Sequence, residues 1–221
     1  MTGKKLSTPC VQVAVDSIDK AAIERVCRLL SGQGGMIIEA GTPTIKMFGI
    51  GICEQMSGWS GGAFIVADLK TMDVGDLEVV IASKGGADAA ICSGVAEKAT
   101  IDPFISECRK KGIVSFVDMM NVKDPVALLK SLAALPDGVS LHRGISAELA
   151  GEAQSFSRVR DVKSAYPKLV VASAGGINEK NSGEAIAAGA DILVAGRFIT
   201  GANDPVEALK KIRDTMGKVR Q

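Results

Sequence analysis

The sequence has few aromatic residues, a single histidine and no excess of charge of either sign. Phe, Trp and Tyr make up 4% of its 221 residues, and His142 is the one histidine. The 26 Lys and Arg residues nearly balance the 25 Asp and Glu residues, which gives a formal net charge of +1. Because this balance provides no basic surface for a polyanion, we expect no nucleic-acid partner.

The cysteines and the apolar runs exclude further classes. The 5 cysteines are an odd number, lie far apart and form no C-x-x-C pair, which argues against a disulfide framework or a zinc site. No stretch reaches the roughly 18 apolar residues of a membrane span, and residues 1–5 lack the apolar core of a secretory signal. We therefore expect a reduced, soluble, cytoplasmic protein with no membrane partner.

What the sequence does contain is a regular alternation of short apolar runs and longer amphipathic segments. This pattern, with 25 glycines and 47% hydrophobic residues, is typical of βα units around a parallel sheet. The expected strands cover residues 11–15, 36–38, 64–67, 87–91, 113–117, 139–141, 169–172 and 192–195. Eight units predict an α/β fold, a single (β/α)₈ TIM barrel domain over residues 1–221, with a doubly wound open sheet as the alternative.

Two pairs of similar segments raise the question of an internal duplication. Gly86-Ala-Asp88 resembles Gly189-Ala-Asp191, and the helix start Asp124-Pro125 resembles Asp204-Pro205. The two offsets disagree, since they are 103 and 80 residues. We interpret the similarities as local solutions that recur, such as an Asp cap followed by Pro at the first helical position. Among the other helices, we expect single ones over residues 44–56 and 147–165.

The stretch 64–75 carries the strongest chemical signal. An apolar run leads into Asp68 and Lys70, and Asp73 follows before Gly75. Because side chains alternate along a strand, Asp68 and Lys70 are expected on one face with Leu69 on the other. A simple ion pair is the alternative interpretation of this triplet.

Other ionisable residues also follow the expected strands. In a barrel, the last residues of every strand meet at one mouth. The residues at these positions are Asp16, Glu39, Asp68, Lys70, Asp118 and His142. Asp16 and Asp118 could instead cap the turns that follow them, whereas Glu39 directly after an apolar run favours a functional role, and His142 favours acid–base work.

Two glycine-containing turns follow the seventh and eighth strands. Gly175 and Gly176 come after one strand, and Gly196 and Arg197 after the next. Barrels commonly bind a phosphate group at these positions, where backbone N–H groups approach the anion and an arginine adds charge-assisted hydrogen bonds. The sequence therefore predicts a phosphorylated substrate.

These motifs together resemble the 3-hexulose-6-phosphate synthase family. The resemblance rests on Asp68-Leu-Lys70-Thr-Met-Asp73-x-Gly75, on Glu39-x-Gly41-Thr-Pro, on Ala174-Gly-Gly-Ile and on Gly196-Arg197, and it covers nearly the whole chain. That family belongs to one barrel suprafamily with 3-keto-L-gulonate-6-phosphate decarboxylase and orotidine 5'-phosphate decarboxylase.

The resemblance implies an activity and a set of residue roles. The activity is an aldehyde-lyase reaction, the reversible condensation of formaldehyde with D-ribulose 5-phosphate to D-arabino-hex-3-ulose 6-phosphate through an enediolate. Glu39 and Asp68 would hold Mg²⁺, Lys70 would stabilise the enediolate and His142 would transfer a proton. The protein would be a homodimer with shared active sites, in which Asp73 enters the partner's site. The substrate would be bound by Asp16, Gly175, Gly176, Gly196 and Arg197, together with Glu39.

The segment after His142 departs from the family pattern. The synthases usually continue H-x-G-x-D, and the decarboxylase carries an arginine one position before that aspartate. This chain has Ile145 and Ser146 at the two positions. Ile145 argues against the decarboxylase, and Ser146 leaves the exact sugar phosphate open. The alternatives are a β-keto sugar phosphate decarboxylase and a non-catalytic barrel that binds a sugar phosphate.

Overall fold

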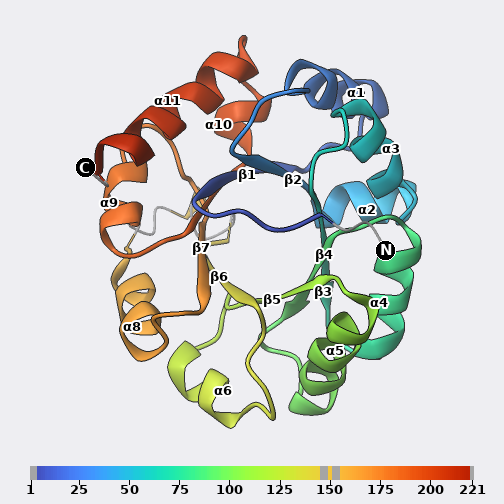
Figure 1. Cartoon of the computed structure of the whole chain (residues 1–221), viewed down its shortest axis with the longest axis vertical. Coiled ribbons are helices and arrows are strands. Elements are labelled where there is room, and N and C mark those ends of the chain that lie inside the picture. Colours follow the sequence, from blue (N-terminus) through green and yellow to red (C-terminus); the bar gives the residue numbers. More distant parts are fainter. Residues whose placement is uncertain (1–3, 145–148, 151–154, 220–221) are drawn as a thin grey trace.

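The chain folds into a closed barrel of eight parallel strands surrounded by helices (Figure 1). The computed structural model describes residues 4–144, 149–150 and 155–219. The strands are β1 (Cys10–Val15), β2 (Met36–Ala40), β3 (Ile65–Thr71), β4 (Ala89–Ser93), β5 (Val114–Asp118), β6 (Gly138–His142), β7 (Val170–Ala174) and β8 (Ile192–Ala195). They pair in sequence order, and β1 closes the ring on β8 with Val11 opposite Leu193. The predicted TIM barrel is confirmed, and the open sheet is wrong.

The helices form the outer ring. Those that the structure describes are α1 (Lys20–Leu29), α2 (Thr42–Phe48), α3 (Ile52–Trp59), α4 (Gly75–Lys84), α5 (Lys98–Lys111), α6 (Pro125–Ser131), α8 (Ser157–Ala165), α9 (Ser182–Ala187), α10 (Arg197–Thr200) and α11 (Pro205–Val219). The main hydrophobic core lies between this ring and the barrel, and a smaller one fills the barrel interior with residues such as Phe64, Ile91 and Phe116. None of the described helices combines the length and the apolar character needed to cross a membrane.

Two of the expected helices differ from the structure. The helix expected over residues 44–56 is two helices, α2 and α3, because Gly49 at the end of α2 adopts a φ of 74° that breaks the helical path. Of the helix expected over residues 147–165, α8 covers the last part. Residues 145–148, among them Ile145 and Ser146, and residues 151–154 lie outside the described residues.

At the N-terminal ends of the strands, aspartates bind the neighbouring strand. Asp88, Asp137 and Asp191 each precede an even-numbered strand, and their Oδ2 atoms accept hydrogen bonds from the backbone N–H groups of Ile65, Ser115 and Val171. The similar segments ending at Asp88 and Asp191 are therefore the same local solution used twice, as the sequence predicted. The Asp-Pro helix starts are a second local solution that recurs. Asp124 accepts from a backbone N–H group of α6, and Asp204 accepts from backbone N–H groups of α11.

The N-terminal segment crosses this face of the barrel before entering β1 (Figure 1). Leu6 packs against the inner core, and Lys4 Nζ donates to Ala63 O (2.8 Å), Ser57 Oγ (3.2 Å) and Asp88 Oδ2 (3.1 Å). The segment thus covers the N-terminal face, while a cavity opens at the C-terminal face.

Candidate active site

A cavity of about 990 Å³ lies at the C-terminal mouth of the barrel. Its size is at the upper end of the range of small-molecule sites. Most of the predicted site residues line it: Asp16, Glu39, Asp68, Lys70, His142, Gly175, Gly176, Gly196 and Arg197. The fold therefore brings together residues from six strands that are spread over more than 180 positions of the sequence.

Lys70 reaches the cavity from an irregular part of β3. Ala67 pairs with Ala90 of β4, but the next pair is Thr71 with Cys92, so three residues of β3 lie opposite one residue of β4. Within this bulge Lys70 has a φ of 45°, a conformation that is unfavourable for residues other than glycine. Leu69 packs outward against the main core as expected. Asp68 and Lys70 therefore both face the cavity, as expected, although the strand carries a bulge between them and does not alternate regularly.

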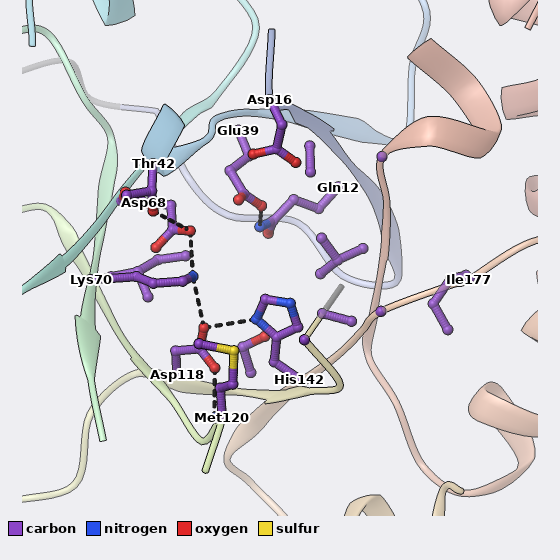
Figure 2. A pocket seen from close by; sticks show the side chains of 18 of the residues that line it. Gln12, Asp16, Glu39, Thr42, Asp68, Lys70, Asp118, Met120, His142 and Ile177 are labelled. Atoms are coloured by element: carbon purple, nitrogen blue, oxygen red, sulfur yellow. Dashed lines mark hydrogen bonds and ion pairs between the residues drawn. The ribbon is translucent and has the colours of Figure 1, made fainter. Parts of the chain in front are cut away.

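A chain of hydrogen bonds links Asp68, Lys70, Asp118 and His142 along one wall of the cavity (Figure 2). Lys70 Nζ donates to Asp68 Oδ2 (2.7 Å) and to Asp118 Oδ2 (3.0 Å). The same Asp118 oxygen lies 2.9 Å from His142 Nδ1, and Asp118 Oδ1 accepts from the backbone N–H of Met120 (2.9 Å). Every oxygen of Asp118 is thus engaged, and Lys70 lies between two carboxylates.

The pKa values of this chain follow from its geometry. Burial alone would raise the pKa of Asp118, but the hydrogen bond and charge of His142, with the charge of Lys70, hold that pKa below its ordinary value. Burial would lower the pKa of Lys70, yet the two carboxylates raise it above the ordinary value. Asp118 is therefore an ionised acceptor, which favours the tautomer in which His142 donates through Nδ1–H.

Glu39 faces the same cavity from β2 and is almost completely buried, with 6% exposure. Gln12 Nε2 donates to its Oε2 at 2.5 Å. Burial and the negative charge of Asp68 raise the pKa of Glu39 to about 8, and Asp16 adds to this while Gln12 and Lys70 oppose it. The carboxylates at this end of the cavity therefore repel one another.

Asp16 completes the acidic end and is packed closely against the start of α2. A side chain at Gly41 would place its Cβ 2.0 Å from Asp16 Oδ1, so only glycine fits there. Burial and the charge of Asp68 raise the pKa of Asp16, against the effects of Lys70, His142 and Arg197. Close packing against Asp16 thus explains the glycine of the Glu-x-Gly-Thr-Pro turn.

The predicted phosphate-binding residues line the cavity after β7 and β8, where Gly196 adjoins Asp16. Gly175 and Gly176 have φ values of 95° and 71°. Gly175 also packs against Arg143, because a Cβ there would lie 2.1 Å from Arg143 O. The fold therefore requires glycine at position 175, and this glycine is also compatible with an anion site. Gly196 is less crowded.

Asp73 is the one predicted site residue that does not line the cavity of its own chain. It is exposed in the loop between β3 and α4, and its Oδ1 accepts from the backbone N–H of Val74. Val74 is itself strained, with a φ of 46° and 51% exposure. The role predicted for Asp73 in a partner's site stays a prediction.

The acidic end of the cavity is the expected place for Mg²⁺. Within the described residues, no group of three or more His, Cys, Asp or Glu side chains could hold a metal ion. However, Mg²⁺ commonly binds through one or two carboxylates and completes its shell with water and substrate oxygens. Asp68 Oδ1 is buried and has no hydrogen-bond partner within the described residues, and Glu39 is buried on the same cavity, where the charge of Asp68 acts on it. The pair Glu39 and Asp68 therefore fits such an ion.

The sequence pattern of the orotidine 5'-phosphate decarboxylase / HUMPS family matches residues 9–212. The chain belongs to this family. A bifunctional enzyme Fae/Hps from Methanocella arvoryzae is 44% identical over 198 residues, which are 89% of this chain and 50% of the relative. A second one, from Methanospirillum hungatei, is 44% identical over 95% of this chain and 53% of the relative. The chain thus spans about half the length of the curated relatives that it matches.

Solved structures of the family share the fold. A crystal structure of 3-hexulose-6-phosphate synthase superposes with a TM-score of 0.82 at 28% identity, over 94% of this chain and 99% of that one. The 3-hexulose-6-phosphate synthase from Salmonella typhimurium gives a TM-score of 0.85 at 26% identity, over 95% and 99%. These similarities agree with the family resemblance seen in the sequence.

Sequence reasoning gave no definite role to three residues of this family member's cavity. Asp118 was weighed only as a possible strand-end group, although it joins Lys70 to His142. Gln12 and Thr42 were not considered, although both donate to the carboxylates. Gln12 could have been found from its position on β1 two residues before Ala14, on the inner face of a strand that is otherwise apolar up to Val15.

Proposed function

We propose that this protein is a Mg²⁺-dependent aldehyde-lyase that reversibly condenses formaldehyde with D-ribulose 5-phosphate to D-arabino-hex-3-ulose 6-phosphate. The observation that carries the proposal is the hydrogen-bonded chain from Asp68 through Lys70 and Asp118 to His142. The names of the Fae/Hps relatives and of the solved 3-hexulose-6-phosphate synthases support it.

The reaction needs a base, a positive charge that stabilises the enediolate, and a side chain that holds both in position. A proton leaves C1 of ribulose 5-phosphate, the resulting enediolate attacks the carbon of formaldehyde, and the new hydroxyl takes up a proton. His142 Nε2 removes the C1 proton while Asp118 holds the ring through Nδ1–H, and Lys70 stabilises the negative charge that develops on the substrate oxygens. Asp118 thus sets the positions of both the base and the cation.

Glu39 and Asp68 would hold the Mg²⁺ ion at the acidic end. When bound, the ion supplies a Lewis acid that stabilises negative charge on substrate oxygens. Asp16 beside them binds substrate hydroxyls. After β7 and β8, the backbone around Gly175, Gly176 and Gly196 and the side chain of Arg197 bind the phosphate, so that the phosphate and the hydroxyls are held by different residues and orient the substrate.

We also propose that the protein is a homodimer with shared active sites, in which Asp73 enters the partner's cavity. Exposed apolar side chains surround Asp73 in sequence and continue along α4, namely Met72, Val74, Leu77 and Ile81. Exposed apolar side chains in such number near one loop are typical of a protein interface. Asp73 lies among them in sequence, next to the strained backbone at Val74.

The proposal is tested by mixing the purified protein with ribulose 5-phosphate, formaldehyde and Mg²⁺ and following formaldehyde. We expect consumption that stops when a chelator removes the metal, and no consumption by Glu39→Gln. Metal-independent consumption would contradict the Mg²⁺ assignment. A wild-type protein that consumes no formaldehyde but releases CO₂ from a β-keto sugar phosphate would be a decarboxylase instead.

A further inference from the structure

The two carboxylates assigned to the metal are held in the same way, each by one oxygen. Glu39 Oε2 accepts from Gln12 Nε2 at 2.5 Å. Asp68 Oδ2 accepts from Thr42 Oγ1 at 3.0 Å and from Lys70 Nζ at 2.7 Å, while Asp68 Oδ1 has no partner within the described residues. Figure 2 shows both contacts on the wall of the same cavity. In each carboxylate, a donor from another element fixes one oxygen.

Gln12 is placed for this contact by the register of the barrel. Ala14 of β1 lies opposite Glu39 of β2, and Gln12 lies two residues earlier on the same inward face. Gln12 is 3% exposed, and its side chain reaches Glu39 from the side nearer the N-terminal ends of the strands. An amide at this position orients the carboxylate without cancelling its charge, which a lysine or arginine would do.

Thr42 makes the second contact from the first residue of α2. Its hydroxyl lies 2.9 Å from Asp68 O and 3.0 Å from Asp68 Oδ2. Because Gly41 lets α2 begin directly against β1, Thr42 is held over the end of β3. Thr42 therefore fixes both the backbone and the side chain of Asp68.

We propose that Gln12 and Thr42 are positioning residues of the cation site: each orients one carboxylate through a neutral donor and leaves its other oxygen to a divalent cation. This inference rests on the proposed function, because it takes Glu39 and Asp68 as the ligands. Groups that orient metal ligands in this way typically change metal affinity by 10- to 100-fold when they are removed.

The test measures Mn²⁺ binding to the metal-free protein by electron paramagnetic resonance, with and without ribulose 5-phosphate. Gln12→Met keeps the length of the side chain and removes the donor, and we expect Kd to rise by about 10-fold or more. Thr42→Val should raise Kd less, by about 3- to 10-fold, because Lys70 still holds Asp68 Oδ2. Thr42→Ser keeps the hydroxyl and should bind like the wild type.

Thr44→Val is the matched control, because it also removes a buried hydroxyl from α2. Thr44 Oγ1 donates to the backbone oxygens of Val15 and Ser17 and not to a carboxylate. We expect a lower melting temperature and a Mn²⁺ Kd within about twofold of the wild type. At saturating Mg²⁺, Gln12→Met should recover most of its kcat, which a residue acting directly on the substrate would not allow.

The outcomes separate this inference from the proposed function. If folded Gln12→Met and Thr42→Val both bind Mn²⁺ like the wild type, the inference is wrong, whatever their activity. If the wild type consumes no formaldehyde but the variants lose Mn²⁺ affinity, the proposed function is wrong and the inference stands. A wild type that binds no Mn²⁺, even with ribulose 5-phosphate, would overturn the inference and the metal assignment together.

Discussion

The two ends of the barrel both carry carboxylates, but in different surroundings. At the N-terminal face, Asp88, Asp137 and Asp191 stand apart, and each accepts from a backbone N–H of the neighbouring strand. Asp88 and Asp191 are also paired with Lys4 and Lys163. At the C-terminal face, four carboxylates line one cavity, namely Asp16, Glu39, Asp68 and Asp118.

The two groups differ in burial as well as in their partners. Asp88 is buried but Asp137 is exposed and Asp191 half-buried, whereas Glu39, Asp68 and Asp118 are all buried. Within the part of the chain that the structure describes, one oxygen of Asp88 has no hydrogen-bond partner, as does one of Asp68, so an unpaired oxygen alone does not mark a functional site. What distinguishes the mouth is that Lys70 joins two of its carboxylates, Asp68 and Asp118, while burial and the charge of Asp68 raise the pKa of Glu39 and of Asp16. Such crowding lowers stability unless a cation or substrate joins it, so we assign stability to one face and chemistry to the other.

Lys70→Ala should produce the largest effect on activity. The variant loses the charge that faces the substrate and leaves Asp68 and Asp118 without their shared cation. We expect formaldehyde consumption to fall by about 10³-fold. The matched variant Lys163→Ala removes the lysine paired with Asp191 at the opposite face and should keep kcat. Comparable losses of activity in both variants would show that stability and catalysis are not divided between the two faces.

Complementation between two inactive variants tests whether each active site contains residues of both chains. Asp73→Ala and Lys70→Ala should each be nearly inactive. In mixed dimers formed at random, one of two sites in half of the molecules has both residues intact, so mixing should restore about a quarter of wild-type activity. Activity of mixtures after subunit exchange gives the measurement. Exchange without recovery would place Asp73 in the site of its own chain or outside catalysis.

The positions of the strand ends were predictable from the sequence because they depend on short-range patterns. Apolar runs ending in a polar residue located Glu39, Asp68 and His142, and barrel closure then brought them together. The order of elements and the two glycine turns followed from the same reasoning.

Contacts across the barrel were not predictable in this way. The bulge at Lys70 depends on how β3 pairs with β4, and no local pattern indicates a positive φ at a lysine. Likewise, Asp118 can cap a turn or bind distant side chains, and only the packed barrel shows that Lys70 and His142 meet on its Oδ2. The break at Gly49 was a missed turn signal, since a glycine with positive φ ends α2.

Glu39→Gln should stabilise the metal-free protein, with a pH dependence of known sign. Burial and Asp68 raise the pKa of Glu39 from 4.5 to about 8, so the folded state holds a proton that the unfolded state releases between these pH values. Stability should therefore fall as pH rises through this window, and Glu39→Gln should reduce the fall by a few kcal/mol. Urea unfolding at pH 4.5 to 9 with a chelator measures this. A steeper fall in the variant would contradict it.

Asp88→Ala should give the smallest change in activity and a clear loss of stability. Asp88 holds the first residue of β3 through Ile65 N–H, at the opposite end of the strand that carries Asp68 and Lys70. Removing a buried acceptor that serves a backbone N–H and Lys4 costs about 1 to 3 kcal/mol of unfolding free energy. We expect kcat within about twofold of wild type while the protein is folded, with Lys4→Ala as the milder control because Lys4 is partly exposed. A tenfold loss of kcat in folded Asp88→Ala would mean that the two ends of β3 are coupled, and the separation of stability from chemistry would then be wrong.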